Sequence, residues 1–403
     1  MTILYITQNG VTDHIGRSQV APYLVGLARR GHDIHVLSAE KSDRDDLIAR
    51  YAREFEIAEI AWTRIPYRNT PRYLGQARTQ WDLRAAARRI VRSERIEAVH
   101  CRSFPPALIG WELKQAFGVK FIFDFRDFYA DGGIAKASGL QKLLSHGLKR
   151  IEGPMIRAAD KVVCLTERAA SLLGEFYLSD RLDPDSHFQV VPCCADFRLF
   201  DPAAVSEADR RRARAKAGLS ESDFILIYLG SLGPDYLLPQ MMALFTQVMA
   251  ARPKAKFLFL ANNGEELVAK ACAAQGVPRE RIAFVSADRD EVPAFLCIAD
   301  LSVIFIRADL SKAGCSPTKL AELFACEVPV IANTGVGDMD RIVDLERRGS
   351  AIVGDFSDKA LRAAVEEVLR PRRATKIREN SREFDLEAGV ERYAKVYDEL
   401  LQR

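Results

Sequence analysis

The stretch Cys315-Ser-Pro-Thr-Lys-Leu-Ala-Glu-Leu-Phe-Ala-Cys-Glu-Val-Pro-Val-Ile-Ala-Asn-Thr-Gly-Val-Gly-Asp338 joins the start of a helix to a buried strand. The Ser316 hydroxyl can cap a helix, and Pro317 suits the first helical position because its missing N–H would be unpaired there. A helix start carries roughly half a positive charge and attracts phosphate, and Lys319 in the first turn adds a full charge. We therefore expect a phosphate-binding helix start here.

The same stretch continues as a helix and then as a strand. Glu322 follows Thr318 by one helical turn, so a carboxylate and a hydroxyl share one face of the helix. Val328–Ala332 has the pattern of a buried strand and ends in the glycine-rich turn Asn333–Gly337. A common helix cap would account for Ser-Pro-Thr-Lys alone. A phosphate-binding helix that leads into a parallel strand indicates nucleotide chemistry.

Three segments, Ser316–Glu322, Pro329–Asn333 and Gly335–Asp338, resemble the donor-binding segment of GT-B glycosyltransferases of family 4. The resemblance implies that Glu322 holds the ribose of a nucleotide sugar and that the backbone before the helix approaches the sugar. The family usually has a second glutamate eight positions upstream, where this chain has Gly314. The donor-binding residues expected from this segment are Gly314, Cys315, Ser316, Thr318, Lys319 and Glu322.

The length of 403 residues is too great for one ordinary core and predicts two domains. Strand and helix patterns alternate from the first residue, restart near residue 224 and indicate an α/β protein. The resemblance implies the GT-B fold, two Rossmann-like doubly wound domains that face a central cleft. We expect an acceptor-binding domain over 1–200, a donor-binding domain over 201–385, and a C-terminal helix over 386–403 that packs back on the first domain.

Composition narrows the class of protein. Hydrophobic residues make up 48% and charged residues 28%, with a net charge of +3, so a nucleic-acid partner is not expected. No apolar run approaches the roughly 20 residues of a membrane span, and Met1–Thr7 has the pattern of a strand, so a cytoplasmic protein is expected. The eight cysteines form no Cys-x-x-Cys pair and have no histidines at metal spacing, so neither a metal nor a cofactor is expected.

The segment Asp13–Gln19 is expected to be a loop between the first strand and the helix Val20–Arg30. Gly16 permits close approach and Arg17 supplies a fixed charge at the carboxyl edge of the sheet, where doubly wound folds bind ligands. The loop is either structural or grips an anionic group. The family resemblance places a glycine-rich loop here, with Gly16 and Arg17 at the donor and Ser18 and Gln19 at the acceptor.

Two strand ends deliver further candidates. The strand Glu97–Cys101 is expected to place His100 and Arg102 in a loop closed by Pro105-Pro106. His100 is either a structural histidine or a contact to the sugar. Family members commonly have His-x-His here, so the resemblance implies catalytic roles for His100 and Arg102.

The strand Lys120–Asp124 is followed by Arg126 and Asp127. Buried and unpaired, these charges would cost several kcal/mol, so they either pair with one another or wait for substrate. We expect Arg126 to act on the acceptor or the leaving group, as a third catalytic residue, and Asp127 to bind the acceptor.

Two helices are rich in basic residues. The one expected over Tyr73–Ser93 carries several arginines, interpreted as a solvated face. The region Ala135–Lys161 alternates leucines with lysines and arginines. It either faces the core or makes a peripheral contact with an anionic membrane, which would place the protein at the cytosolic face of the inner membrane.

One loop departs from the family pattern. Family members usually have an arginine directly after the glycine at the position of Gly230 and a lysine a few residues later, and both clamp the donor diphosphate. This chain has Ser231 in the first place and Tyr236 and Leu237 in the second. Either Lys319, Arg17 and helix N-termini supply the charge, or the donor is a less charged nucleoside monophosphate sugar.

The resemblance implies a metal-independent glycosyltransferase. It would move a sugar from a nucleotide-sugar donor to a glycan or lipid-linked acceptor with retention at the anomeric carbon, in cell-surface polysaccharide biosynthesis. Two alternatives stay open. A nucleotide-sugar epimerase has the same two-domain form, and Gly314 with Ser231 is also compatible with a protein that binds nucleotide sugars without catalysis.

Overall fold

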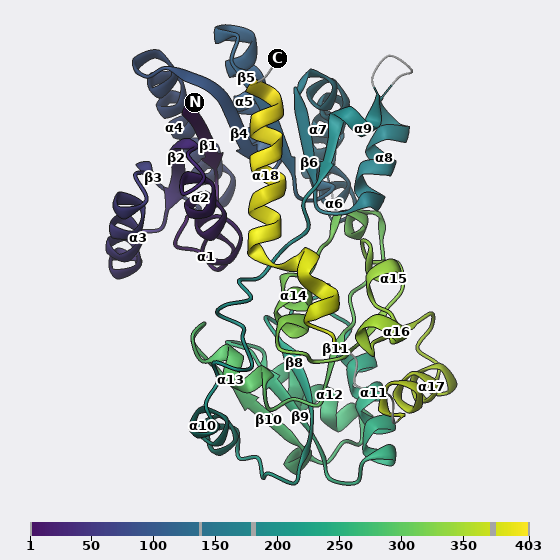
Figure 1. Cartoon of the computed structure of the whole chain (residues 1–403). Helices are drawn as coiled ribbons and strands as arrows, with labels where there is room; N and C mark the ends of the chain where they lie inside the picture. The colour runs from purple at the N-terminus through teal and green to yellow at the C-terminus, as the bar shows by residue number, and fades with distance from the viewer. Residues whose placement is uncertain (1, 137–138, 179–182, 371–375, 402–403) are drawn as a thin grey trace. The chain divides into compact units, whose positions relative to one another are not determined.

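The computed structural model describes residues 2–136, 139–178, 183–370 and 376–401. The chain divides into two compact units (Figure 1). Unit 1 holds Met1–Cys193, Ala313–Cys315 and Leu386–Arg403, and unit 2 holds Cys194–Lys312 and Ser316–Asp385. Each unit is built on its own parallel sheet, which confirms the expected pair of Rossmann-like domains.

Within its described residues, unit 1 contains a seven-stranded parallel sheet in the order β3-β2-β1-β4-β5-β6-β7. Its strands are β1 (Thr2–Thr7), β2 (Asp33–Glu40), β3 (Ala61–Pro66), β4 (Ile96–Arg102), β5 (Lys120–Phe125), β6 (Lys161–Cys164) and β7 (Phe188–Val190). The order reverses between β1 and β4. The carboxyl ends of these two strands form the topological switch point, where ligands bind in such sheets.

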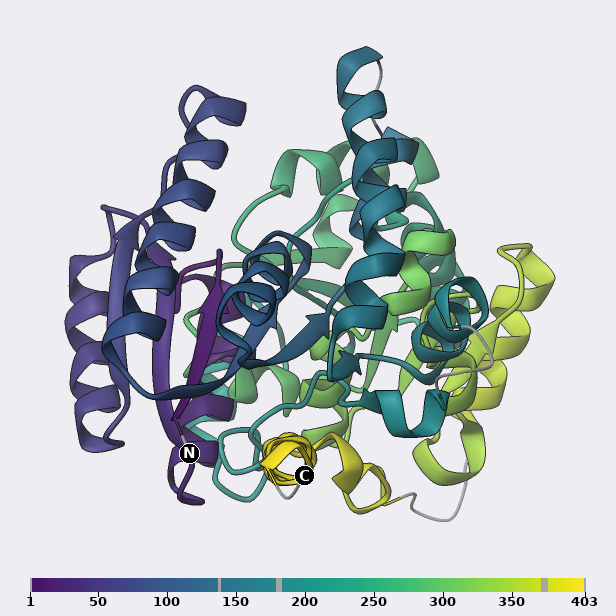
Figure 2. The ribbon, with the colours of Figure 1, turned by 90° about the horizontal axis from the view of Figure 1, so that it is seen from above.

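The helices of unit 1 cover both faces of the sheet (Figures 1 and 2). They are α1 (His14–Gln19), α2 (Ala21–Ala28), α3 (Asp45–Ile57), α4 (Arg72–Ser93), α5 (Phe104–Phe117), α6 (Tyr129–Lys136), α7 (Gly139–Ala158), α8 (Glu167–Tyr177), α9 (Pro184–His187) and α18 (Leu386–Leu401). The segment expected to be a loop over 13–19 is the short helix α1. The region expected to be one helix over 135–161 contributes to two, α6 and α7.

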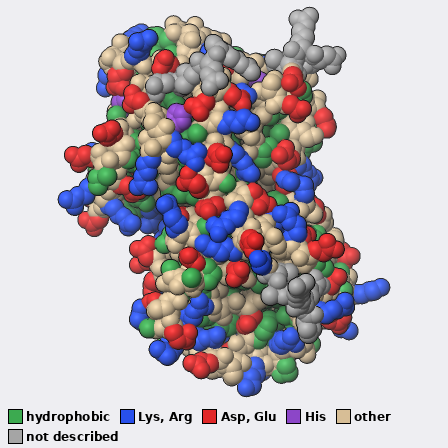
Figure 3. All heavy atoms as spheres, in the orientation of Figure 1, with side chains coloured by type: hydrophobic (Ala, Val, Ile, Leu, Met, Phe, Trp, Pro, Cys, Tyr) green, Lys and Arg blue, Asp and Glu red, His purple; other side chains and the backbone are tan. Residues whose placement is uncertain are grey.

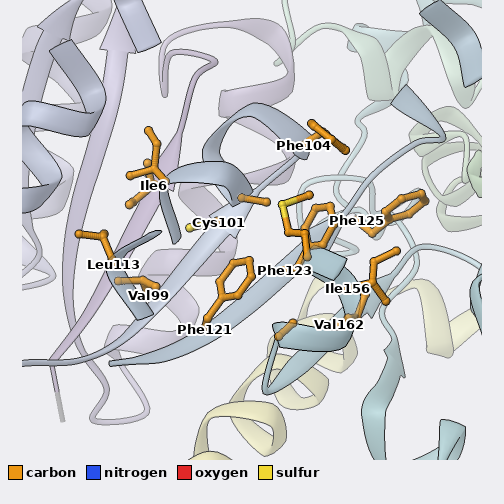
Figure 4. Close-up of a cluster of buried hydrophobic side chains, with 14 of the residues drawn as sticks. Ile6, Val99, Cys101, Phe104, Leu113, Phe121, Phe123, Phe125, Ile156 and Val162 are labelled. Atoms are coloured by element: carbon orange, nitrogen blue, oxygen red, sulfur yellow. The ribbon is translucent and has the colours of Figure 1, made fainter. Parts of the chain in front are cut away.

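Aromatic and aliphatic side chains fill the space between β4, β5 and the helices on one face (Figure 4). Phe121, Phe123 and Phe125 alternate with residues that face the other side of β5, as the two-residue period of a strand requires. Phe121 and Phe123 are fully buried. Cys101 lies in the same cluster. In the described structure none of the eight cysteines is in a disulfide, and most are buried as expected.

The C-terminal helix α18 packs on unit 1 against α2. Gly26 makes this possible, because a Cβ atom there would lie 2.6 Å from Cγ2 of Val390. Along α18, Val390, Tyr393, Val396 and Tyr397 are all buried. The sequence analysis expected the last helix to pack back on the first part of the chain. In the structure, α18 makes these contacts with α2 and clusters with unit 1.

Within its described residues, unit 2 contains a six-stranded parallel sheet in the order β10-β9-β8-β11-β12-β13, which reverses between β8 and β11. The strands are β8 (Phe224–Leu229), β9 (Ala255–Leu260), β10 (Ile282–Val285), β11 (Leu301–Ile304), β12 (Val330–Asn333) and β13 (Ala351–Val353). The helices are α10 (Glu207–Ala217), α11 (Leu238–Ala251), α12 (Glu265–Gln275), α13 (Val292–Leu296), α14 (Thr318–Ala325), α15 (Met339–Ile342), α16 (Leu345–Arg348) and α17 (Asp358–Leu369).

Acidic and basic side chains are interspersed over the visible surface (Figure 3), as the near balance of charge in the sequence predicts. Among the described residues, no helix combines the length and the apolar character needed to cross a bilayer.

Candidate functional site

The helix α14 begins one residue later than the sequence predicted. Pro317 is the N-cap residue, with φ −67° and ψ 115°, and makes no side-chain capping bond. The extended ψ angle keeps Pro317 outside the helix, so Ser316 precedes the cap and does not serve as the cap itself. Thr318 and Lys319 therefore occupy the first two helical positions, where backbone N–H groups point out of the helix end.

Lys319 lies between two aromatic rings. Its Nζ atom is 4.4 Å from the ring centroid of Tyr228 and 4.3 Å from that of Tyr236. It also donates a hydrogen bond of 3.3 Å to the Tyr228 hydroxyl. Two cation–π contacts fix the ammonium group in one place. Burial raises the pKa of Tyr228 far above its usual value, so this hydroxyl stays neutral.

Gly230 lies directly against this lysine. Its φ of +111° favours glycine, and a Cβ atom there would lie 3.1 Å from Lys319 Nζ. The next residue, Ser231, is exposed, and its carbonyl oxygen accepts a 2.8 Å hydrogen bond from the Tyr228 hydroxyl. Where the family has a second cation, this chain thus has Tyr236, which holds the cation of α14. The structure brings Gly230, Ser231 and Lys319 together.

Glu322 is buried, with 8% of its surface exposed, and pairs with Arg289 at 3.3 Å. Burial raises the pKa of this carboxyl, although Arg289 and Lys319 both act to lower it. The sequence analysis missed Arg289. It follows β10 in the loop before α13, and the rule that functional side chains gather at the carboxyl ends of parallel strands could have found it.

The segment Ala313–Cys315 makes its contacts within unit 1. A Cβ atom on Gly314 would lie 3.6 Å from the Cα atom of Asp127, and the Thr166 hydroxyl donates a 2.6 Å hydrogen bond to the Ala313 carbonyl. The sequence grouped Gly314 and Cys315 with the donor-binding residues of the second domain. Their contacts place Gly314 beside Asp127, which was expected to bind the acceptor.

The residues after β1 are held by a carboxylate that the sequence analysis missed. Glu40, at the end of β2, accepts hydrogen bonds from the Val11 N–H at 2.7 Å and from the Thr12 hydroxyl at 2.6 Å. A Cβ atom on Gly16 would lie 2.1 Å from the Gly10 carbonyl oxygen. A larger residue at position 16 would collide with the Gly10 carbonyl, so the close approach of these two backbone segments requires glycine.

The other predicted residues of this segment lie on α1. Arg17 is 3.2 Å from His14 Nδ1, and the Ser18 hydroxyl donates to the His14 carbonyl at 2.9 Å. Gln19 is buried with 6% of its surface exposed. The segment follows β1, so Arg17 and Ser18 remain close in sequence to the switch point of the sheet.

His100 and Arg102 lie inside β4, not in a following loop. The strand continues because Arg102 pairs in register with Thr7 of β1 and Asp124 of β5. Pro105 and Pro106, expected to close a loop, stand in the first turn of α5, a position that suits proline. The exposed surface is 1% for His100 and 6% for Arg102, so both side chains are nearly closed off from solvent.

His100 joins a polar network under α18. Its Nδ1 atom is 2.7 Å from the Tyr397 hydroxyl, and its Nε2 atom is 3.5 Å from Asp124 Oδ2. Arg126 pairs with Asp124 at 3.0 Å and donates to the Tyr393 hydroxyl at 3.3 Å. The charges at this strand end therefore pair with one another, which was one of the two outcomes expected.

This network favours an ionised carboxylate. Burial alone would raise the pKa of Asp124, but the Arg126 guanidinium and His100 outweigh it and hold the pKa well below its usual range. Among the described side chains, the buried atoms His100 Nε2, Arg102 Nε and Arg126 Nε have no hydrogen-bond partner. The two arginine Nε–H groups are buried donors near one edge of the sheet and leave capacity for an oxygen-rich ligand. Asp127 is exposed beside them.

Two family models match the chain. The Glycosyl transferase 4-like domain matches residues 17–186, and the Glycosyl transferases group 1 domain matches residues 209–384. A curated relative, the D-inositol 3-phosphate glycosyltransferase of Segniliparus rotundus, is 28% identical over 169 residues. That match covers 40% of this chain and spans only a third (33%) of the relative's length.

Solved structures share the fold over the full length. A glycosyltransferase from Rickettsia africae superimposes with a TM-score of 0.72 at 17% identity, covering 100% of this chain and 99% of the other. HepE from Anabaena, solved with UDP and glucose, gives 0.68 at 14% identity, covering 98% and 99%. With a glycosyltransferase family model matching most of each unit and this fold shared from end to end, the chain belongs to the GT-B glycosyltransferases.

Proposed function

We propose that this protein transfers a sugar from a nucleotide-sugar donor to a glycan or lipid-linked acceptor. Unit 2 binds the donor, and unit 1 binds the acceptor. The proposal rests above all on α14, which has a fixed cation at its start and a buried carboxylate one turn later. The cation suits the phosphates of a nucleoside diphosphate, and the carboxylate suits its ribose. HepE, bound to UDP and glucose in its crystal, supports this class of donor.

In this proposal Lys319 and the N-terminal amides of α14, with Ser316 and Thr318, neutralise the donor phosphates. These groups stabilise the negative charge that grows on the departing phosphate, so the reaction requires no metal. The close packing of Gly230 on Lys319 brings the backbone of Gly230 and Ser231 near the same charge. We therefore favour a nucleoside diphosphate sugar over the monophosphate alternative. A cation that is held rigidly and partly screened from water attracts the more highly charged donor more strongly.

Glu322 accepts hydrogen bonds from the ribose hydroxyls, and Arg289 favours its ionised form against the burial that raises its pKa. An ionised carboxylate is a strong acceptor, and the 3.3 Å contact with Arg289 lowers the cost of its burial. The ribose must displace part of this ion pair or share it. Arg289 thus becomes a second determinant of nucleotide binding.

In unit 1, Arg126 is the residue that meets the acceptor or the leaving group, and Asp127 with Ser18 and Gln19 binds the acceptor. His100 and Arg102 are too deeply buried to reach a sugar in this conformation, so we assign them the role of positioning Asp124 and Arg126. Gly16 and Arg17 close the same edge of the sheet. Transfer proceeds with retention at the anomeric carbon, and cell-surface polysaccharide assembly is the setting.

A test combines binding and turnover. Glu322→Ala should raise the Kd for a nucleotide sugar about tenfold or more, the value of one or two hydrogen bonds to a charged group. Glu266→Ala, an exposed glutamate in the first turn of α12, is the matched control. Unchanged affinity in Glu322→Ala, with equal loss of stability in both variants, would refute the role.

The two alternative functions give different products. An epimerase changes the sugar when the nucleotide sugar is the only substrate, which proton NMR of the donor detects. A non-catalytic binding protein, which Gly314 and Ser231 would suit, binds the donor but leaves it intact with every acceptor. Release of free nucleotide only when a glycan or lipid-linked acceptor is added supports transfer.

A further inference from the structure

The helix α4 exposes large apolar side chains on its outer face. Leu74, Trp81 and Tyr73 are 72%, 62% and 59% exposed, although side chains of this size usually contribute to a core. Leu74 and Trp81 are seven residues apart, which is two helical turns, so they lie on the same face. Leu74 and Trp81 form an apolar strip along the helix, and Tyr73 lies about 100° around the helix from Leu74, at the edge of the strip.

The opposite face of α4 already packs on the sheet of unit 1. Leu83 and Ala87 are fully buried and Ile90 nearly so, and the helix contacts β1, β2 and β3. The exposed strip is therefore separate from the face of α4 that packs on the sheet. The helix has two apolar faces, one buried in the core and one exposed to solvent.

Arginines border this strip. Arg78 and Arg84 have 63% and 45% of their side chains exposed, and Arg89 and Arg92 are exposed further along the helix. The Arg84 guanidinium lies 5.9 Å from the Trp81 ring centroid. Carboxylates compensate only in part, because Asp82 pairs with Arg78 and Glu112 pairs with both Arg84 and Arg88. The face keeps an excess of positive charge.

We propose that the α4 face, formed by Tyr73, Leu74, Arg78, Trp81, Arg84 and Arg89, binds the surface of an anionic lipid bilayer. Tryptophan and tyrosine prefer the level of the lipid headgroups, and leucine can enter the acyl boundary beside them. Each arginine near an anionic surface adds electrostatic attraction. An apolar strip with basic borders matches a bilayer, which offers an acyl boundary to the apolar side chains and anionic headgroups to the arginines.

The helix α7 of the same unit also exposes basic and apolar side chains. Figure 2 shows α4 and α7 reaching beyond the other helices of unit 1, and in the first turns of α7 Lys142 and Leu143 are exposed, the latter by 67%. The C-terminal half of α7 instead packs inward through Met155 and Ile156. The inference rests on the proposed function in one respect, since a lipid-linked acceptor would lie in this bilayer.

The test is co-flotation of the full-length protein with vesicles of phosphatidylcholine mixed with phosphatidylglycerol, compared with vesicles of phosphatidylcholine alone. We expect binding to the mixed vesicles that weakens as salt is added, because the charged component is screened. The double variant Leu74→Ser/Trp81→Ser should lower partitioning by about tenfold or more, since it removes most of the inserted apolar area. Arg78→Glu/Arg89→Glu should lower it by a similar factor.

Ile57→Ser on α3 is the matched control, because Ile57 is 78% exposed but lies outside the α4 face. It should bind vesicles as the unaltered protein does. Circular dichroism and the melting temperature should stay unchanged in all variants, since every altered side chain is exposed. Equal binding of the Leu74→Ser/Trp81→Ser variant, or equal binding to both kinds of vesicle, overturns the proposal.

Preference for single-stranded nucleic acid over vesicles would also overturn it, because aromatic and arginine side chains can stack on bases. Calorimetry with UDP-glucose in the same preparations separates this proposal from the proposed function. Lost vesicle binding with intact nucleotide-sugar binding in the α4 variants supports the membrane face. Absent nucleotide-sugar binding in a protein that still binds vesicles refutes the proposed function alone.

Discussion

At the scale of single residues, Lys319 shows how a site with few cations can still hold an anion. Two tyrosine rings and one hydroxyl fix its ammonium group, so little side-chain entropy remains to be lost when a phosphate binds. A family-type clamp would use separate cations. Here Tyr236 occupies one of those positions and instead restrains the cation of α14.

Lys319→Ala should raise the Kd for a nucleotide sugar by about 10- to 100-fold, the range expected for loss of a charge-assisted hydrogen bond. Isothermal titration calorimetry measures the change. Lys270→Ala, an exposed lysine on α12, serves as the control and should leave the Kd unaltered. An equal, small change in both variants would mean that the donor phosphates bind elsewhere.

Glu322 gives donor binding a dependence on pH. Burial raises its pKa, so the carboxylate is lost at a higher pH than an ordinary glutamate, and affinity for a nucleotide sugar should fall as pH drops through that range. Glu322→Gln should abolish the dependence. Arg289→Ala should move the fall to higher pH, because it removes a charge that lowers the pKa. Titrations across a pH series distinguish these outcomes, and a fall shifted to lower pH in Arg289→Ala would contradict the assignment.

Residues close in sequence could be predicted together, and residues joined only by the fold could not. The spacing of Lys319 and Glu322 on one helix was visible in the sequence. The pairing of Glu322 with Arg289 crosses 33 positions, and that of Glu40 with Thr12 crosses 28, so neither has a local pattern. Tyr236 was noted as a departure, but its contact with Lys319 joins the segment between β8 and α11 to α14, and the sequence has no local pattern for that.

At the scale of elements, runs of apolar residues located every strand named in the sequence analysis. The strands of a parallel sheet are buried on both faces and therefore appear in the sequence as nearly continuous apolar runs. The helix α1 was missed since Gly16 and Ser18 are weak helix formers. Glu40 holds Val11 and Thr12 just before this helix, a contact between distant positions that the sequence does not reveal. β4 was ended too early because the buried charge of Arg102 is unusual inside a strand. Neighbouring Asp124 makes it tolerable.

Gly16→Ala tests the tight segment after β1. A Cβ atom would lie 2.1 Å from one backbone carbonyl oxygen and 2.4 Å from another, and backbone cannot move aside cheaply. We expect the free energy of unfolding to fall by several kcal/mol, about the range of severe overpacking. Gly147→Ala on α7, which has open space around it, should be neutral or stabilising by up to about 1 kcal/mol. Chemical denaturation measures both, and a neutral Gly16→Ala would show that the segment rearranges.

Tyr397→Phe tests how α18 is fastened to unit 1. It removes the hydroxyl that bonds His100 at 2.7 Å and leaves a buried ring nitrogen without its partner. The free energy of unfolding should fall by about 1–3 kcal/mol. Asp398→Asn, the next residue and an exposed one, should change it by no more than about 0.5 kcal/mol. Similar values for the two variants would remove the His100 bond from the account.

At the scale of the whole molecule, the restart of strand and helix alternation near residue 224 predicted two sheets, and two sheets are present. Glycosyltransferase models match one part of the chain each, over residues 17–186 and 209–384. The assignment of Ala313–Cys315 to unit 1 could not be predicted, since three residues carry no periodicity. Only the contacts made in the folded chain reveal it.

A thermal-shift screen across nucleotides tests the whole protein. A nucleoside diphosphate sugar at 100 times its Kd should stabilise the protein by about 2.7 kcal/mol, and a nucleoside monophosphate should do less at equal concentration. The stabilisation should persist in EDTA, because helix N-termini and Lys319 neutralise the phosphates. Loss of the shift on chelation would contradict a metal-independent site.

Because Leu386–Leu401 supplies buried residues such as Val390 and Tyr397 to unit 1, the order of synthesis matters. On the ribosome, residues 1–193 emerge first but lack the helix that covers them, whereas unit 2 is complete once residue 385 has emerged. Multidomain chains commonly finish their N-terminal domain first. Here the nascent residues 1–193 must wait, with the surface that binds Tyr393 and Tyr397 uncovered, until residues 386–401 have been translated.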